Sequence, residues 1–163
     1  MMKQKMLKKL MIFAVAGMMT AGMGSSVQAS EIDLSDPLGT ETDADYSEDI
    51  SFSTSLARSS HLNCGASTIR RLSSNQVNIT SDTQCHHECD KLWLDMYLER
   101  KVDGVYSTYK YWNFTALNST SLSRSMNVIV PSGYYYRLRA YHAAKEGTTK
   151  ESTTTRTQGI LVN

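Results

Sequence analysis

The fold is decided by residues 92–98, which read Leu92-Trp93-Leu94-Asp95-Met96-Tyr97-Leu98. An aliphatic side chain stands at every second position of this stretch. Because successive side chains of a β-strand point to opposite faces, the aliphatic residues all share one face. The stretch therefore predicts a core strand whose outward face carries two aromatic side chains, Trp93 and Tyr97.

Short runs of similar character lie on both sides of this strand, and no segment after Arg58 has a sustained helical period. Turn residues separate the runs; Asp103-Gly104, for example, tolerates the positive φ of a tight hairpin. We expect seven strands, at residues 64–72, 76–81, 90–100, 105–114, 122–130, 134–144 and 152–162. This number and spacing predict an all-β, seven-strand immunoglobulin-like sandwich over residues 60–163.

Residues 1–29 have the features of a secretory signal peptide. Four lysines precede an apolar run at residues 10–23, which is short for a membrane span. Val27 and Ala29 supply a small-residue pattern for cleavage after Ala29. We therefore expect a secreted, extracellular protein that meets the membrane only during export.

Residues 30–59 differ in charge from the rest of the chain. Eight acidic residues and no basic one lie between Ser30 and Ala57, whereas the chain from Arg58 onward carries 13 Lys and Arg against 8 Asp and Glu, a net charge of +5. An acidic run repels itself and buries little apolar surface, so we expect a disordered leader or linker at residues 30–59. A net charge of +5 is too small to indicate nucleic acid as a partner.

Two cysteines and two histidines fall within residues 85–89, immediately before the core strand. If the strands alternate in direction, Cys64 lies at the same end of the fold. In an oxidising compartment we expect a disulfide between Cys64 and Cys89, with Cys85 free or an alternative partner. Closing this loop would stabilise the fold by about 3 kcal/mol.

A metal site or a thiol-redox site is the alternative for this end of the fold. His61, Cys64, Cys85 and Cys89 form two short-spaced ligand pairs, the arrangement in which proteins hold structural zinc, and His86, His87 and His142 are possible substitutes. A thioredoxin-like role is disfavoured because three residues separate Cys85 from Cys89, where that motif has two. We find no catalytic motif, so we expect no enzyme activity and no cofactor other than zinc in this alternative.

Outward aromatic and basic residues suggest a binding surface. Trp93 and Tyr97 are joined by aromatic residues of the returning strand (Tyr109, Tyr111 and Trp112) and by two arginines of a later strand (Arg137 and Arg139). Such residues suit a cell-wall polymer, a glycan or another extracellular protein. The alternative is that the aromatic residues are core and the arginines a solvated strand face. The favoured function is a non-catalytic extracellular binding module.

Residues 128–141 carry a proline-glycine turn followed by a tyrosine-bearing strand with alternating arginines. This stretch resembles the second half of fibronectin type III domains, which implies a β-sandwich. The chain from Cys64 onward also resembles a family of small secreted proteins of unknown function from Gram-positive, clostridial-type bacteria. Residues 90–100, Gly104 and residues 133–137 carry that second resemblance, which implies fold and secretion only.

Overall fold

A computed structural model describes residues 41–52 and 60–163, and this part of the chain contains strands and turns but no helix. Its strands are β1 (Glu41–Thr42), β2 (Tyr46–Phe52), β3 (Leu62–Ser73), β4 (Gln76–Val102), β5 (Val105–Ile129), β6 (Tyr134–Glu146), β7 (Thr149–Arg156) and β8 (Gly159–Val162). The predicted signal peptide lies outside the described residues. No helix of the described part is long and apolar enough to cross a membrane.

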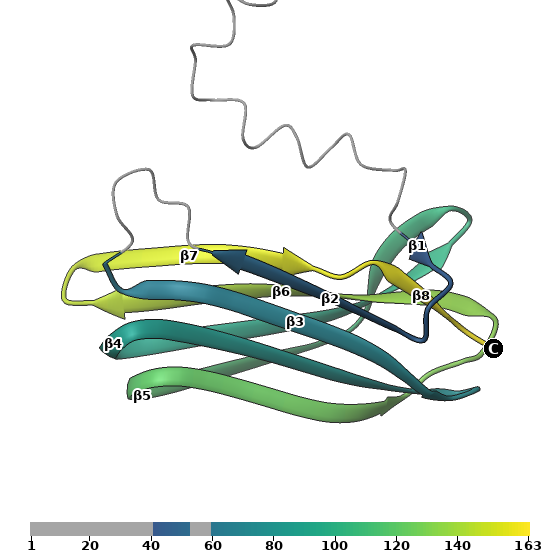
Figure 1. The fold of residues 1–163 in the computed structure, drawn as a ribbon, viewed down its shortest axis with the longest axis horizontal. Coiled ribbons are helices and arrows are strands. Elements are labelled where there is room, and N and C mark those ends of the chain that lie inside the picture. Colours follow the sequence, from purple (N-terminus) through teal and green to yellow (C-terminus); the bar gives the residue numbers. More distant parts are fainter. Residues whose placement is uncertain (1–40, 53–59) are drawn as a thin grey trace, which may run out of the picture. The chain divides into compact units, whose positions relative to one another are not determined.

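The strands form one mixed sheet in the order β1-β8-β6-β4-β3-β2, with β5 paired to β4 and β7 paired to β6 (Figure 1). The short pair β1–β8 is parallel, and the other pairs are antiparallel. The prediction of an all-β fold is confirmed. The strand count differs from seven, because the described residues form eight strands with different boundaries.

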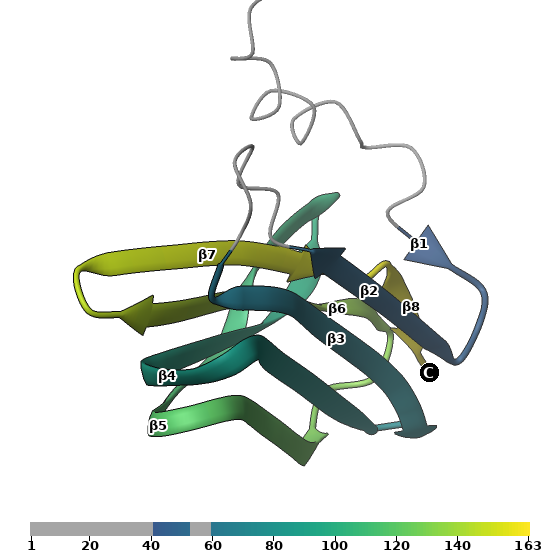
Figure 2. The ribbon, with the colours of Figure 1, turned by 60° about the vertical axis from the view of Figure 1, so that its left-hand side comes forward.

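Strands β4 and β5 form a long hairpin around the expected turn, where Asp103 and Gly104 both have positive φ (50° and 82°). Both strands bend sharply (Figure 2). The first half of β4 pairs with β3 and its second half pairs with β6, with a register shift against β5 between Gln84 and Cys89. The expected strands 76–81 and 90–100 are therefore two halves of β4, because the segment between them stays extended, and 105–114 and 122–130 are likewise halves of β5.

The core follows the alternation read from residues 92–98. Leu92, Leu94, Met96 and Leu98 have no exposed surface. In the first half of β4 the buried positions are odd-numbered, as at Val77 and Ile79, so the bend at residues 84–89 changes which positions face inward. One strand thus supplies core residues to both halves of the sheet.

Part of the predicted acidic leader belongs to this sheet. Strand β2 pairs with β3 from Tyr46 opposite Arg70 to Phe52 opposite Cys64. Its other side meets β7, where Ser51 Oγ lies 2.7 Å from Thr153 Oγ1 and the Asp49 carboxylate accepts a hydrogen bond from the Arg156 backbone N–H. These contacts curl the sheet nearly into a barrel (Figure 2). Residues 46–52 therefore differ from the expected disordered leader because backbone pairing gives this acidic run a partner; residues 30–40 and 53–59 lie outside the described part.

The last predicted strand, 152–162, is interrupted at Thr157. Its hydroxyl accepts a hydrogen bond from the Leu138 N–H, and its own N–H donates to the Leu138 carbonyl. The interruption separates β7 from β8, and β8 continues along β6 opposite Tyr134, Tyr135 and Tyr136.

Candidate functional site

The outward face of β4, β5, β6 and β7 carries aromatic and basic side chains. Tyr97 on β4 is the register partner of Arg139 on β6 and of Tyr111 on β5. The Tyr97 and Tyr111 rings stack with centroids 6.5 Å apart, and the Arg139 guanidinium lies 4.2 Å from the Tyr97 centroid. These three residues form the first half of what we call the aromatic face.

Trp93 forms the other half of the aromatic face and lies four residues before Tyr97 on β4. The Lys150 and Lys91 ammonium groups lie 4.6 Å and 4.9 Å from its ring centroid, and Lys150 also lies 5.6 Å from the Tyr141 centroid. The aromatic face therefore comprises Lys91, Trp93, Tyr97, Tyr111, Arg139, Tyr141 and Lys150. Our reading of the sequence did not identify Lys91, Tyr141 and Lys150 as members. Lys91 lies two residues from Trp93 on the same strand, and the pairing of β4 with β6 and of β6 with β7 brings Tyr141 and Lys150 to the same face.

Arg137 lies beside this face and is held by a carboxylate. The buried Glu99 accepts hydrogen bonds from Arg137 Nε at 2.7 Å and from Arg139 Nε at 2.8 Å. Burial alone raises the pKa of Glu99, but the hydrogen bonds and charges of Arg139 and Arg137 outweigh it and hold that pKa below its ordinary value. Arg137 also lies 4.0 Å from the Tyr106 ring centroid. Glu99 thus fixes both arginines.

Two of the aromatic residues singled out in the sequence lie on the inner side. Trp112 pairs with Met96, and both Trp112 and Tyr109 pack against the core. Tyr109 meets Tyr136 edge to face with centroids 6.0 Å apart. Tyr109 and Trp112 therefore follow the alternative given by the sequence, in which aromatic residues of a strand pack in the core.

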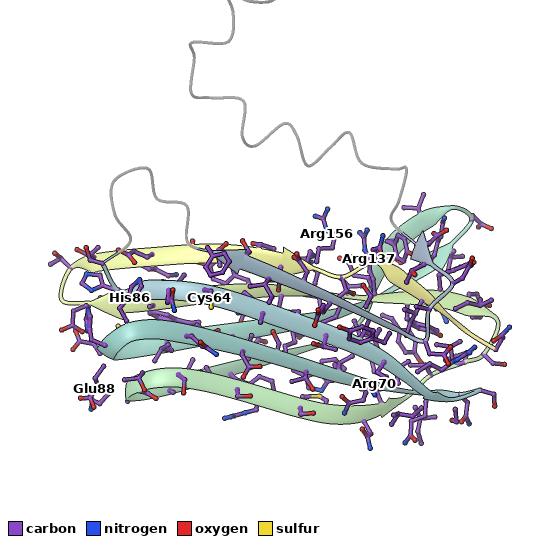
Figure 3. The ribbon with its side chains drawn as sticks, in the orientation of Figure 1. Cys64, Arg70, His86, Glu88, Arg137 and Arg156 are labelled. Carbon is purple, nitrogen blue, oxygen red and sulfur yellow. The ribbon has the colours of Figure 1, made fainter. Side chains whose placement is uncertain are left out.

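A second cluster, which we call the His/Cys cluster, lies where β3 begins and β4 bends. The side-chain ligand atoms of His61, His87 and Cys89 lie within 4.8 Å of one another. His61 Nδ1 is 3.0 Å from His87 Nε2, and the two rings meet edge to face. Cys64, His86 and Glu88 lie at the same end of the sheet (Figure 3).

All three cysteines are free thiols in this structure. Cys85 packs with Cys89 against Leu62 and Ala144. Burial, followed by the interaction with the Cys89 thiol, raises the pKa of Cys85 to about 12. Cys64 lies apart, with Sγ 3.9 Å from Gln84 Oε1. The structure therefore does not join Cys64 to Cys89, and that disulfide stays a prediction.

His142, named in the sequence as a substitute ligand, lies in the core and away from the His/Cys cluster. Its Nδ1 is 2.9 Å from Thr83 Oγ1, and its Nε2 is 2.8 Å from Thr155 Oγ1. Burial lowers its pKa to about 4. Because both nitrogens have hydroxyl partners, this ring is a structural residue.

Comparison with known proteins identifies the family. Residues 29–159 match the model of a family described as "Family of unknown function (DUF6147)", and the chain belongs to that family. No curated protein matches. Among solved structures, the sporulation control protein Spo0M from Bacillus subtilis is similar over 61% of this chain and 49% of that chain, about half of its length, with 11% identity and a TM-score of 0.39.

Proposed function

We propose that this protein is exported and acts outside the cell as a non-catalytic module that binds an anionic carbohydrate polymer through the aromatic face. One observation carries the proposal: Trp93, Tyr97 and Tyr111 share a face with cationic groups, which already lie over the Trp93 and Tyr97 rings. Sugar rings stack on such aromatic side chains, and acidic groups on the polymer would pair with the cations.

Charge favours an anionic polymer over a neutral one. The aromatic face carries three cationic residues, Lys91, Arg139 and Lys150. The acidic residue Asp95 lies between Trp93 and Tyr97 on β4 and pairs with Tyr141. The nearby Glu99 is already neutralised by its two arginines. An approaching polyanion therefore meets more positive than negative charge.

We further propose kinship with fibronectin type III-like sandwiches as the scaffold of this module. The Tyr136 hydroxyl donates a hydrogen bond to the Pro131 carbonyl at 2.8 Å. A tyrosine that bonds to the backbone a few residues upstream is a hallmark of such domains, where it fixes the corner before a strand.

Binding of polygalacturonate, measured by titration calorimetry, tests the carbohydrate proposal. We expect Trp93→Ala to weaken binding about tenfold or more, corresponding to about 1.4 kcal/mol. Added salt should weaken binding further, because the cationic contribution is screened. Tyr46→Ala is the matched control, because Tyr46 also lies under an arginine, Arg70, but on another part of the sheet.

Two polymers distinguish the parts of the proposal. Dextran supplies sugar rings without charge, and polyglutamate supplies charge without sugar rings; each should bind more weakly than polygalacturonate. Failure of polygalacturonate to bind, or an equal loss in Tyr46→Ala and Trp93→Ala, contradicts the proposal.

A further inference from the structure

Beyond the carbohydrate-binding role and independently of it, we propose that the His/Cys cluster is a zinc site. The ligands are His61 Nδ1, His87 Nε2, Cys89 Sγ and Cys85 Sγ. The first three of these atoms already lie within 4.8 Å of one another, and Cys85 packs against the small core cluster that contains Cys89. Two cysteines and two histidines form one of the standard tetrahedral donor sets for structural zinc.

The hydrogen bonding of His87 prepares one ligand. Its Nδ1 lies 2.7 Å from the Glu88 carbonyl oxygen, which can only accept, so Nδ1 carries the proton. In the neutral ring Nε2 then has a lone pair, and this atom faces His61 Nδ1. A ring N–H bonded to a backbone carbonyl is the usual support for a histidine that binds metal through its other nitrogen.

The backbone around His61 is held from β7. The Glu151 carboxylate accepts hydrogen bonds from the N–H groups of Ser60, His61 and Leu62, at 2.9, 3.1 and 2.7 Å. The His61 carbonyl in turn accepts from the His86 N–H at 2.9 Å, which joins the start of β3 to the bend of β4. Ligands that are 24 to 28 residues apart in the sequence are therefore held together before any metal arrives.

The cysteines supply the soft half of the donor set. Cys89 is 1% exposed and pairs in register with Ser119 of β5, so its position is fixed by the sheet. Thiolate and imidazole ligands favour zinc over magnesium or calcium, which prefer oxygen. On binding, each thiol releases its proton to water, and two thiolates balance the double charge of the ion. The His61 proton moves from Nδ1 to Nε2, which frees Nδ1 as a ligand.

This set differs from the one expected from the sequence in one member. His87 takes the place of Cys64, whose sulfur lies against Gln84. His87 replaces Cys64 in the ligand set because the bend of β4 turns His87 toward His61 at the start of β3.

Metal analysis of the full chain, purified with reductant and loaded with Zn²⁺, tests the proposal. We expect one zinc per chain, and a Co²⁺-loaded sample should show thiolate-to-metal charge transfer and the intense visible bands of tetrahedral cobalt. His87→Ala should weaken zinc binding more than about 100-fold, beyond the loss typical of a supporting residue. His87 is exposed, so this variant should still fold.

His86→Ala and Cys64→Ser are the matched controls, because each removes a potential ligand next to the cluster but outside the proposed set. Both should keep one zinc per chain and the cobalt spectrum. Cys85→Ser should keep a weaker site whose charge-transfer band loses about half of its intensity, since one of two sulfur ligands is lost.

Three outcomes overturn the proposal. They are the absence of zinc from the reduced, loaded protein, an equal loss in His86→Ala and His87→Ala, and a Cys85–Cys89 disulfide that persists under reductant in the intact mass. The carbohydrate-binding proposal survives all three, because polygalacturonate binding uses a different face.

Discussion

His142 and the His61–His87 pair are both imidazole sites held by hydrogen bonds, but their partners differ. His142 is fully buried, and each of its ring nitrogens meets a threonine hydroxyl. In the pair, one nitrogen of His61 faces one nitrogen of His87 at 3.0 Å, next to a thiol. The first arrangement uses up every ring nitrogen on hydroxyl groups, whereas the second directs two ring nitrogens to one point.

The hydroxyl partners of His142 belong to a directed chain of hydrogen bonds through the core. The Ala66 carbonyl can only accept, so His142 Nε2–H donates to Thr155, Thr155 to Ser67, Ser67 to Ser81, and Ser81 to the Ala66 carbonyl. Nδ1 is then left to accept from Thr83. Every member is satisfied while the ring is neutral, and the chain links β6 and β7 to β3 and β4. His142 is therefore structural because hydroxyl groups occupy both of its nitrogens, whereas the geometry of His61 and His87 leaves them suited to the zinc site that we propose.

The largest expected loss of stability comes from a substitution that crowds the buried His142 ring. A Cβ atom added at Gly65 would lie 2.3 Å from His142 Cδ2 and 2.4 Å from Cγ. Hydrogen bonds at both nitrogens prevent the ring from moving away. We expect Gly65→Ala to lower the free energy of unfolding by about 3 kcal/mol or more, measured by urea denaturation. In a double-mutant cycle with His142→Ala the two losses should fall short of additivity by about 1 kcal/mol or more; additive losses would contradict the clash.

Acid tests the same ring, because protonation is disfavoured where the ring is buried. The folded-state pKa of His142 is about 4, below its ordinary value of 6.5, because burial disfavours the charged ring. The unfolded chain therefore takes up a proton first as the pH falls below 6.5. The stabilisation is full above pH 6.5 and is lost progressively toward pH 4, by about 3 kcal/mol in total.

Urea denaturation at a series of pH values measures this loss. His142→Gln can bond to both threonines but has no titrating group, so its free energy of unfolding should fall less steeply between pH 6.5 and 4. Parallel curves for the variant and the parent protein would assign the acid sensitivity to other groups.

The sequence predicted what depends on local alternation. The buried set from Leu92 to Leu98 and the turn at Asp103-Gly104 follow from a period of two and from residues that tolerate positive φ. The outward placement of Trp93 and Tyr97 follows from the same period.

What the sequence did not predict depends on pairing between distant segments. The register shift between Leu98 and Glu99 changes the alternation along the hairpin, so Tyr109 packs inward in a way that a count along β5 alone does not reveal. The acidic composition of residues 46–52 led us to expect disorder, but these residues form a strand whose Asp49 carboxylate accepts a backbone hydrogen bond from Arg156 of β7. His87 replaced Cys64 in the His/Cys cluster because the bend of β4 sets which side chains converge.

The smallest expected effect completes the comparison of the two histidine sites. In metal-free protein, His87→Ala should change the free energy of unfolding by no more than about 0.5 kcal/mol, the range of ordinary surface substitutions, because the side chain is exposed. His142→Ala in the same buffer should cost several times more, since it opens a cavity and leaves the hydroxyls of Thr83 and Thr155 without their ring partner. Urea denaturation with a chelator present measures both. A large loss for His87→Ala without metal would mean that the His61–His87 contact supports the fold by itself, and the two sites would then be alike.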